Sequence, residues 1–435
     1  MNRRQFFKKA TTSVIALLKL YMGKNILASN GIYAQNIKKL KRDPSRVLDI
    51  HSSLKYKIIS SRGNVMEDGF RVPDLADGMG AFRMGQYSVL VRNHELAPRH
   101  GIRRSAFIDN ESKIKTLGGK HYDPKIFGGT TNIVFDEKNQ KVLREFLSLS
   151  GTSTNCAGGI TPWNTWLTCE EDANTKKHGY VYEVVPETEI GVQAPVPIKT
   201  LGRFNHEAVA FDSYQNAYLT EDKSDGLFYR FTPENRGSLR SGKLMALRFL
   251  DTPSQDTRNI FGKSFFSGKT YRVEWIRLDD IDPKKNTLRN EGQDKNAAIF
   301  CRGEGIINDQ ESIYFCCTEG GPIKRGQIWK YTPTNSENGV IELWYEVQDK
   351  GTLHMPDNIT FSPWGDLIIC EDNSNLNRIW GLTPSGSAYL IAKNSYTGAE
   401  FAGACFSPKG ETLFVNLQQN GQTFAINGDW AELKS

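Results

Sequence analysis

The chain of 435 residues repeats one short pattern six times, and this repeat restricts the possible fold more than any other feature. Each copy starts with a small or acidic residue and continues with an apolar run, a turn and a second apolar run. The second run ends in a polar or acidic residue. In the third copy, the runs are 206–211 and 217–222. Linked antiparallel strands that recur at intervals of roughly 40–50 residues are typical of β-propellers.

A third strand follows most copies, with Gly before it and Pro after it. The sequence therefore predicts an all-β fold, a six-bladed propeller in which residues 35–435 form a single domain. The intervals are uneven because a polar and charged stretch at about 240–300 separates copies three and four. This stretch contains Phe261, Phe265 and Phe266. We expect it to form an inserted loop or small cap over the site, between blades three and four. The copies begin and end at these positions: 78–95, 156–171, 206–222, 302–319, 356–372 and 403–418.

Residues 1–34 have the features of an export signal. Arg3-Arg4 followed by the modest apolar stretch 10–20 resembles a twin-arginine signal. Lys19 interrupts this stretch, which is too short for a stable membrane span. We expect recognition by the twin-arginine export machinery and a periplasmic or secreted protein. A basic N-terminal helix with no targeting role is the alternative.

The formal net charge of +6 does not indicate a nucleic-acid partner. Residues 1–34 carry six Lys and Arg and no Asp or Glu, so they account for the whole excess. The rest of the chain is balanced and has no basic stripe, and we expect no nucleic-acid binding.

Seven cysteines are present, and none forms a Cys-x-x-Cys pair. An exported protein can contain one or two disulfides, but an odd count leaves at least one free thiol. Most of the cysteines lie in apolar runs, where a buried and inert thiol is usual. Cys156 differs because it lies in the Gly-rich stretch 154–159.

The repeat predicts where the polar ends of the copies meet. The innermost strands of a propeller line the channel, and an antiparallel hairpin brings its two open ends together. Residues that start the first run and residues that close the second run should therefore lie at one mouth of the channel. The starting residues are Cys156, Glu207, Glu304, Asp357 and Asn358. The closing residues are Glu95, Glu170, Glu171, Glu221, Asp222, Glu319, Glu371 and Asp372.

So many carboxylates at one mouth cannot all stay ionised unless cations or protons compensate them. Bound metal ions provide that compensation. Oxygen-only groups suit Ca²⁺, and those in this set are Asp357, Asn358, Glu371 and Asp372. A thiolate among carboxylates, as Cys156 would supply, suits a transition metal such as iron. The alternative is that these acids end their strands as turn residues that face water.

Three basic side chains accompany the acids. Arg302 precedes Glu304 by two residues and can hold a phosphate oxygen bidentately, or it can balance the acids as an ion pair. His94 and His206 lie in matching Asn-His-Glu motifs, where they orient their neighbours or act as ligands. The chain contains no Gly-x-Ser-x-Gly, Walker A or His-Glu-x-x-His motif.

These motifs together resemble the PhoX-type alkaline phosphatases, which are twin-arginine-exported β-propeller enzymes. The resemblance rests on Cys-x-x-Gly-x-x-Pro-Trp-x-Thr-Trp-x-Thr-Cys-Glu-Glu at 156–171, with Asn-His-Glu, Glu-Asp, Arg-Gly-Glu-Gly and Pro-Asp-Asn elsewhere. It implies phosphomonoester hydrolysis by a ferric pair with calcium ions and a bridging oxo group. It further implies Fe³⁺ at Cys156, Glu171, Glu207 and Glu304, phosphate at Arg302, and Ca²⁺ near Glu95, Asp222, Asp357, Asn358, Glu371 and Asp372.

The sequence departs from this family in two respects. The chain is short against typical members, and Ala208 follows Glu207 where the family more often has Gly. These departures leave the substrate range open.

We therefore expect a monomeric, metal-dependent phosphatase for small phosphate monoesters, with an iron–calcium cluster at the channel mouth and Arg302 and Glu304 as catalytic residues. One alternative is a calcium-dependent propeller lactonase, which could use Glu207, Asp357 and Asn358 but needs neither Cys156 nor Arg302. Another is a non-catalytic propeller that serves as a binding module in the cell envelope.

Overall fold

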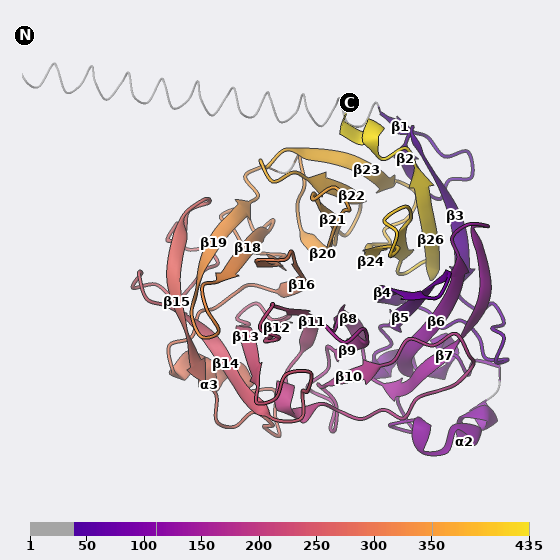
Figure 1. Ribbon diagram of the computed structural model, residues 1–435, viewed down its shortest axis with the longest axis horizontal. Coiled ribbons are helices and arrows are strands. Elements are labelled where there is room, and N and C mark those ends of the chain that lie inside the picture. Colours follow the sequence, from indigo (N-terminus) through magenta and orange to yellow (C-terminus); the bar gives the residue numbers. More distant parts are fainter. Residues whose placement is uncertain (1–38, 110, 350, 435) are drawn as a thin grey trace, which may run out of the picture.

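The computed structural model describes residues 39–109, 111–349 and 351–434 (Figure 1). The predicted export signal of residues 1–34 lies outside the described residues. The described chain forms five antiparallel sheets around a common centre, and its only α-helices are the short α2 (Ile114–Leu117) and α3 (Leu288–Asp294). The predicted all-β, propeller-like fold is therefore confirmed. No helix of the described part is long and apolar enough to cross a membrane.

Three of the sheets have three or four strands. The first contains β4 (Ala76–Met84), β5 (Tyr87–His94), β6 (Gly128–Asp136) and β7 (Lys141–Thr152). The second contains β8 (Asn155–Ile160), β9 (Trp166–Glu170) and β10 (Val181–Val184). The third contains β24 (Phe401–Phe406), β25 (Leu413–Leu417), β26 (Gln422–Gly428) and β3 (Leu54–Ser61). Because β3 pairs with β26, a strand from near the start of the described chain completes the last sheet and closes the circle.

The other two sheets are larger. One contains β20 (Pro356–Phe361), β21 (Leu367–Glu371), β22 (Asn377–Leu382), β23 (Ala388–Asn394), β2 (Asp49–His51) and β1 (Leu40–Lys41). The nine-stranded sheet contains β11 (His206–Phe211), β12 (Ala217–Glu221), β13 (Phe228–Pro233), β14 (Gly242–Phe249), β15 (Thr270–Arg277), β19 (Gly339–Glu346), β18 (Gln327–Pro333), β17 (Ile313–Cys317) and β16 (Gly303–Asn308).

The stretch at 240–300 explains why the described strands form five sheets instead of the six separate ones expected for six blades. This stretch supplies β14, β15 and α3. Strand β15 pairs with β14 on one side and with β19 on the other, so it joins repeats three and four into one sheet. The expected loop or cap is therefore wrong for the residues that form these strands, which extend the sheet at its outer side (Figure 1).

Apolar side chains pack between neighbouring strands and sheets. The second strands of the repeats are almost wholly buried, as β12 is along its length, and this burial accounts for the apolar run that opens each of them. Phe228 of β13 stacks on Phe315 of β17 with ring centroids 4.2 Å apart, and Trp329 and Trp380 are fully buried. Such burial contributes about 25 cal/mol per Å² of apolar surface to stability.

The inner strand of every repeat carries the same irregularity. The six inner strands β4, β8, β11, β16, β20 and β24 contact their neighbours in a closed ring. In each, the inner strand carries one extra residue close to the start of its hairpin, as between His206 and Val209 of β11. A β-bulge of this kind bends the strand and redirects a side chain. The first residues in the six bulges are Asp77, Cys156, Glu207, Glu304, Asp357 and Gly403.

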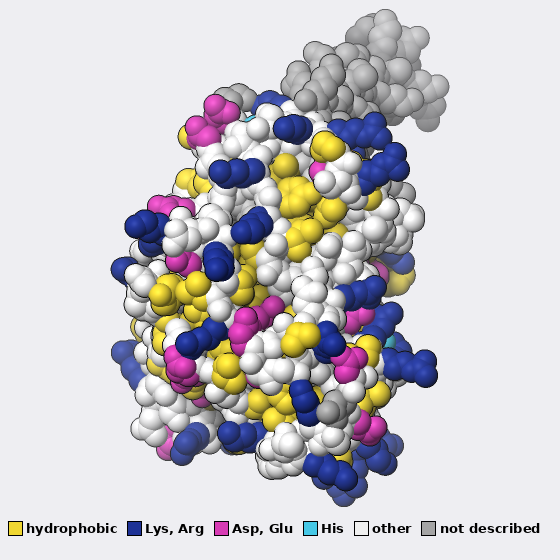
Figure 2. Space-filling model, turned by 90° about the vertical axis from the view of Figure 1, so that its right-hand side faces the viewer, with side chains coloured by type: hydrophobic (Ala, Val, Ile, Leu, Met, Phe, Trp, Pro, Cys, Tyr) yellow, Lys and Arg dark blue, Asp and Glu magenta, His cyan; other side chains and the backbone are white. Residues whose placement is uncertain are grey.

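Charged side chains are interspersed on the side of the molecule shown in Figure 2. Lys and Arg lie among acidic and apolar side chains there and do not form one continuous stripe.

A buried ion pair connects the first sheet with the sheet that closes the circle. Arg92 of β5 is almost fully buried and donates to Glu145 Oε1 at 2.7 Å and to Thr423 Oγ1 of β26 at 2.6 Å. Ser60 of β3 donates to the same carboxylate at 2.6 Å. Loss of one partner leaves the other charge buried without compensation.

We predict that Arg92→Leu lowers the free energy of unfolding by about 3–5 kcal/mol, because Glu145 then remains buried and unpaired. The exposed pair between Arg144 and Glu189 is the control, and Arg144→Ala should cost less than about 1 kcal/mol. Urea denaturation measures both. Equal losses in the two variants would contradict this role of Arg92.

Candidate metal centre

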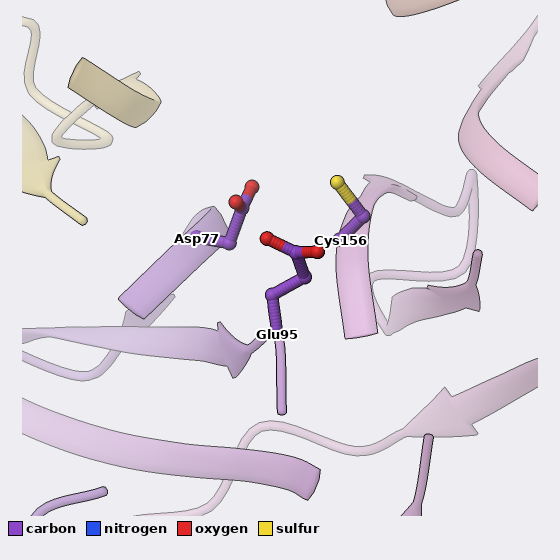
Figure 3. Close-up of side chains that lie close together, drawn as sticks. All are labelled: Asp77, Glu95 and Cys156. Atoms are coloured by element: carbon purple, nitrogen blue, oxygen red, sulfur yellow. The ribbon is translucent and has the colours of Figure 1, made fainter. Parts of the chain in front are cut away.

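Acidic side chains and one thiol form a continuous strip at the open ends of the inner hairpins, which we call the acidic mouth. Three groups of potential ligands overlap, and in each group one ligand atom of every member lies within 4.8 Å of the others. The groups are Asp77, Glu95 and Cys156; Cys156, Glu171 and Glu207; and Glu207, Glu304 and Asp357. Because Cys156 and Glu207 are shared, the groups connect. Figure 3 shows the first group, whose three side chains point toward one another.

The hairpin geometry produces this strip. Asp77, Cys156, Glu207, Glu304 and Asp357 each occupy the first position of a bulge. Glu95 and Glu171 come directly after the second strands β5 and β9. Of the predicted metal ligands, the structure thus brings together Glu95, Cys156, Glu171, Glu207, Glu304 and Asp357.

Sequence reasoning missed Asp77. It started the first copy at Gly78, one residue too late. Asp77-Gly78 stands in the first bulge as Glu304-Gly305 stands in the fourth. This shared pattern of an acid followed by Gly is the sequence signal that would have identified Asp77 as the first residue of the bulge.

Asn358 and Glu371 are two of the four predicted ligands that lie outside the three groups of the strip. Asn358 Oδ1 accepts a hydrogen bond from the backbone N–H of Gly403 at 2.6 Å, so this side chain connects two inner strands. Glu371 is fully buried and accepts from Arg378 Nε at 2.6 Å, Trp380 Nε1 at 2.9 Å and the backbone N–H of His354 at 2.9 Å. Both side chains already have partners within the sheets.

Glu170 and Glu221 resemble Glu371 in this respect. Glu170 accepts from the backbone N–H groups of Ser153 and Gly179, and Glu221 accepts from the Tyr229 hydroxyl at 2.7 Å. Both glutamates are fully buried. In each acidic pair that closes a second strand, the first acid therefore fastens the hairpin. The second acid does not have this role and lies at the mouth.

The two histidines have structural partners. His94 Nδ1 lies 3.0 Å from the carbonyl oxygen of Asp74, and its Nε2 lies 3.0 Å from Thr131 Oγ1. His206 Nε2 lies 3.0 Å from the carbonyl oxygen of Gly202. Burial lowers the pKa of both imidazoles, which are therefore neutral at neutral pH. This arrangement favours orientation of the neighbouring acids over ligation.

Arg302 lies at the same mouth. Its Nη2 donates to Glu304 Oε1 at 2.7 Å and its Nε to Asp222 Oδ1 at 3.0 Å, while Nη1 lies 3.5 Å from Asp372 Oδ2. The structure therefore places Asp222 and Asp372 as partners of Arg302, outside the three ligand groups. Arg302 adopts a left-handed backbone conformation with a φ of 50°. Such strain in a non-glycine residue is common at functional sites.

Hydrogen bonds from the protein do not pair all the carboxylate oxygens of the strip, and Glu207 is the clearest case. It is fully buried, and neither carboxylate oxygen has a hydrogen-bond partner. Burial, followed by the charges of Glu171 and Asp357, raises the pKa of Glu207 well above its ordinary value. Burial, together with Asp77 and Glu207, likewise raises the pKa of the Cys156 thiol. An unpaired carboxylate in such a place costs several kcal/mol unless a proton or cation compensates it.

The donor set fits metal ions. Four of the six carboxylates that meet here come from four different inner strands, the other two directly follow second strands, and a single thiol is shared by two of the groups. Hard oxygen ligands suit Ca²⁺, and a thiolate among them suits a transition metal. The strip can therefore hold metals.

A cavity of about 510 Å³ lies in the same channel beyond the bulges. Its lining is mainly apolar and includes Val209, Ile306 and Ile359. The one carboxylate in this lining, that of Asp212, accepts hydrogen bonds from the Asn216 side chain and from the Tyr218 hydroxyl. The carboxylate of this cavity thus has protein partners, whereas both oxygens of Glu207 in the strip have none.

We predict that the metal-free protein loses stability as the pH rises from about 4 to 7. Burial raises the pKa of Glu95 and of Asp357 to about 7, so the folded state holds protons in this range that the unfolded state has released. Thermal unfolding in chelator should give a lower melting temperature at pH 8 than at pH 5.

Glu95→Gln should weaken this dependence, whereas Glu319→Gln, an exposed acid at the same mouth, should leave it unchanged. A melting temperature of the chelated protein that rises between pH 5 and pH 8 would contradict the placement of these carboxylates.

Solved structures resemble the chain to different degrees. The structure of Pseudomonas fluorescens PhoX in complex with vanadate, a transition state analogue, is 17% identical, with a TM-score of 0.68 over 88% of this chain and 96% of that chain. This likeness shows the fold. Virginiamycin B lyase from Staphylococcus aureus with quinupristin is 13% identical, over 86% of this chain and 99% of that chain, with a TM-score of 0.40. A gluconolactonase from Xanthomonas campestris is 10% identical, over 89% and 99%, with a TM-score of 0.41.

The scores of the lyase and the gluconolactonase are too low to support an argument about this chain. No curated protein matches it in sequence. The family described as alkaline phosphatase PhoX matches residues 35–421. The chain therefore belongs to the PhoX family of alkaline phosphatases and is a phosphoric ester hydrolase.

Proposed function

We propose that this phosphatase hydrolyses phosphate monoesters with an iron–calcium cluster bound at the acidic mouth of the channel. The observation that carries the proposal is the fully buried Glu207 carboxylate, which has no hydrogen-bond partner and is shared by two ligand groups. A carboxylate in that position is either protonated or balanced by a cation, and a bound metal provides the balance when the group is ionised.

We assign Fe³⁺ to the part of the strip that contains Cys156, with Glu171, Glu207 and Glu304 as its other ligands. A thiolate among carboxylates supports this assignment. We assign Ca²⁺ to the oxygen-only ligands Glu95 and Asp357, together with Asp77.

Four further residues were expected to serve Ca²⁺. Asp222 and Asp372 lie next to Arg302 and can join a calcium site if that ion pair rearranges. Asn358 and Glu371 would have to give up the hydrogen bonds that fasten their strands. We therefore propose structural roles for Asn358 and Glu371.

When bound, the metals supply Lewis-acid stabilisation of the charge on the phosphoryl group. Arg302 adds a cation that can hold a phosphate oxygen. Glu304 and Asp222 fix the Nη2 and Nε edge of the guanidinium, whereas Nη1 lies 3.5 Å from Asp372 and 3.8 Å from Glu319. Nη1 is thus the donor with the weakest protein partners, and we propose that it contacts the substrate.

We propose that the nine-stranded sheet represents two blades that β15 joins at their outer strands, which gives six blades in all. The closed ring of six inner strands supports this count. So does the bulge that recurs in each of the six hairpins.

The cellular proposals rest on the sequence alone. We propose export by the twin-arginine machinery and a monomeric, periplasmic or secreted enzyme that acts on small phosphate esters and does not bind nucleic acid. The lactonase alternative gives no role to Cys156 or Arg302, although both lie at the mouth. For this reason we prefer the phosphatase with a mixed cluster.

Cys156→Ser and Glu304→Gln should each abolish iron binding and the turnover of p-nitrophenyl phosphate together, because each removes a ligand from the shared cluster. Elemental analysis and steady-state kinetics measure the two losses. Cys405→Ser is the matched control, since Cys405 is another free thiol on an inner strand, but it lines the apolar cavity. Full activity of an iron-free preparation would refute the proposal.

Arg302→Lys should lower kcat/KM for p-nitrophenyl phosphate about 10²–10³-fold while the iron content stays near that of the unchanged protein. A point charge replaces the planar fork but still balances the acids. If Arg302 serves only as a counter-charge, the variant will keep its activity.

A further inference from the structure

The loop 256–266, which lies between β14 and β15, is fixed beside Arg302. Arg258 Nη1 donates to the carbonyl oxygen of Ser224 at 3.1 Å, and the backbone N–H of Gly321 donates to the carbonyl oxygen of Arg258 at 2.8 Å. Ser224 follows Asp222 by two residues, and Gly321 follows Glu319 by two. Asp222 and Glu319 are both ion-pair partners of Arg302. The loop therefore rests on the two turns that flank this arginine.

The loop is held in one shape by its own side chains. Asn259 is buried, accepts from the backbone N–H groups of Ser264 and Phe265 at 3.0 Å each, and donates to Glu346 Oε1 at 2.6 Å. Phe265 is fully buried and anchors the far side of the loop. A segment with this many internal and external bonds is pre-organised and loses little entropy when it contacts a ligand.

Phe261 lies at the tip of this rigid loop. It is 87% exposed, the highest value among the large hydrophobic residues that the structure describes. The Arg258 guanidinium, fixed at 2.8 Å by both oxygens of Asp256, lies 5.9 Å from the centroid of the Phe261 ring. A single exposed aromatic residue needs no explanation. The Phe261 ring is presented by a fixed loop whose Arg258 bonds the turns on both sides of Arg302, and with the Arg258 cation near it the ring can serve as a stacking platform.

We propose that Phe261 is a specificity-determining residue that stacks on the leaving group of phosphate monoesters with a planar aromatic or heteroaromatic ring. The phosphate of such an ester lies at Arg302, and the ring of its leaving group extends toward loop 256–266. Phe261 does not touch the reacting atoms, so its contribution is to substrate binding. The inference rests on the proposed function and names the substrate class of that same site.

The test compares KM and kcat for p-nitrophenyl phosphate and for glycerol 2-phosphate, which has no ring. Phe261→Ala should raise KM for p-nitrophenyl phosphate roughly fivefold to tenfold, the range expected for loss of one aromatic stacking contact. Its kcat, and both constants for glycerol 2-phosphate, should stay unchanged. Phe261→Trp should restore the low KM.

Two controls separate the possible failures. Ile160→Ala removes an exposed apolar side chain at the opposite end of the channel and should change neither substrate's constants. If the unchanged enzyme is active and Phe261→Ala affects both substrates equally or neither, the role of Phe261 is refuted and the phosphatase proposal stands. If the unchanged, metal-loaded enzyme hydrolyses neither substrate, the proposed function fails and this inference fails with it.

Discussion

Electrostatic repulsion among buried carboxylates is the constraint on which the site of this protein depends. Glu207 is fully buried with two unpaired oxygens, between Glu171 and Asp357, whose charges both raise its pKa. At such distances two like charges in a protein interior repel by several kcal/mol. This repulsion opposes folding, so other interactions of the fold must hold the carboxylates together in the metal-free protein. A bound cation attracts the same carboxylates and offsets their mutual repulsion, so they act as its ligands.

The propeller-like ring provides the rigidity that this arrangement needs. Five of the six inner hairpins have a bulge that presents an acid or a thiol to the strip, and a neighbouring buried residue fastens the hairpin end in several of them. Glu170 and Glu371 show this division, because their oxygens accept bonds from the surrounding strand or from Arg378. The acids that follow them are left for the mouth. In each of these turns one acid stabilises the hairpin, and the next acid is available to bind a ligand.

The sequence predicted the inner hairpins because their apolar runs are short and recur at matched positions, and it predicted Cys156, Glu207 and Glu304 because acids or a thiol recur at one position of the repeat. It missed Asp77 despite the match between Asp77-Gly78 and Glu304-Gly305, since a bulge adds residues that simple strand alternation does not count. The choice between two adjacent acids, such as Glu371 and Asp372, depends on a partner elsewhere in the chain, here Arg378. The pairing of β15 with β19 likewise depends on tertiary contacts that no local pattern encodes.

Anomalous scattering at the iron edge from crystals of the metal-loaded enzyme tests the central claim most directly. We predict an anomalous peak bonded to Cys156 Sγ and to the carboxylate of Glu207, inside the strip at the channel mouth. Crystals of active enzyme without a metal peak at this mouth, or with the iron bound elsewhere, would contradict the account.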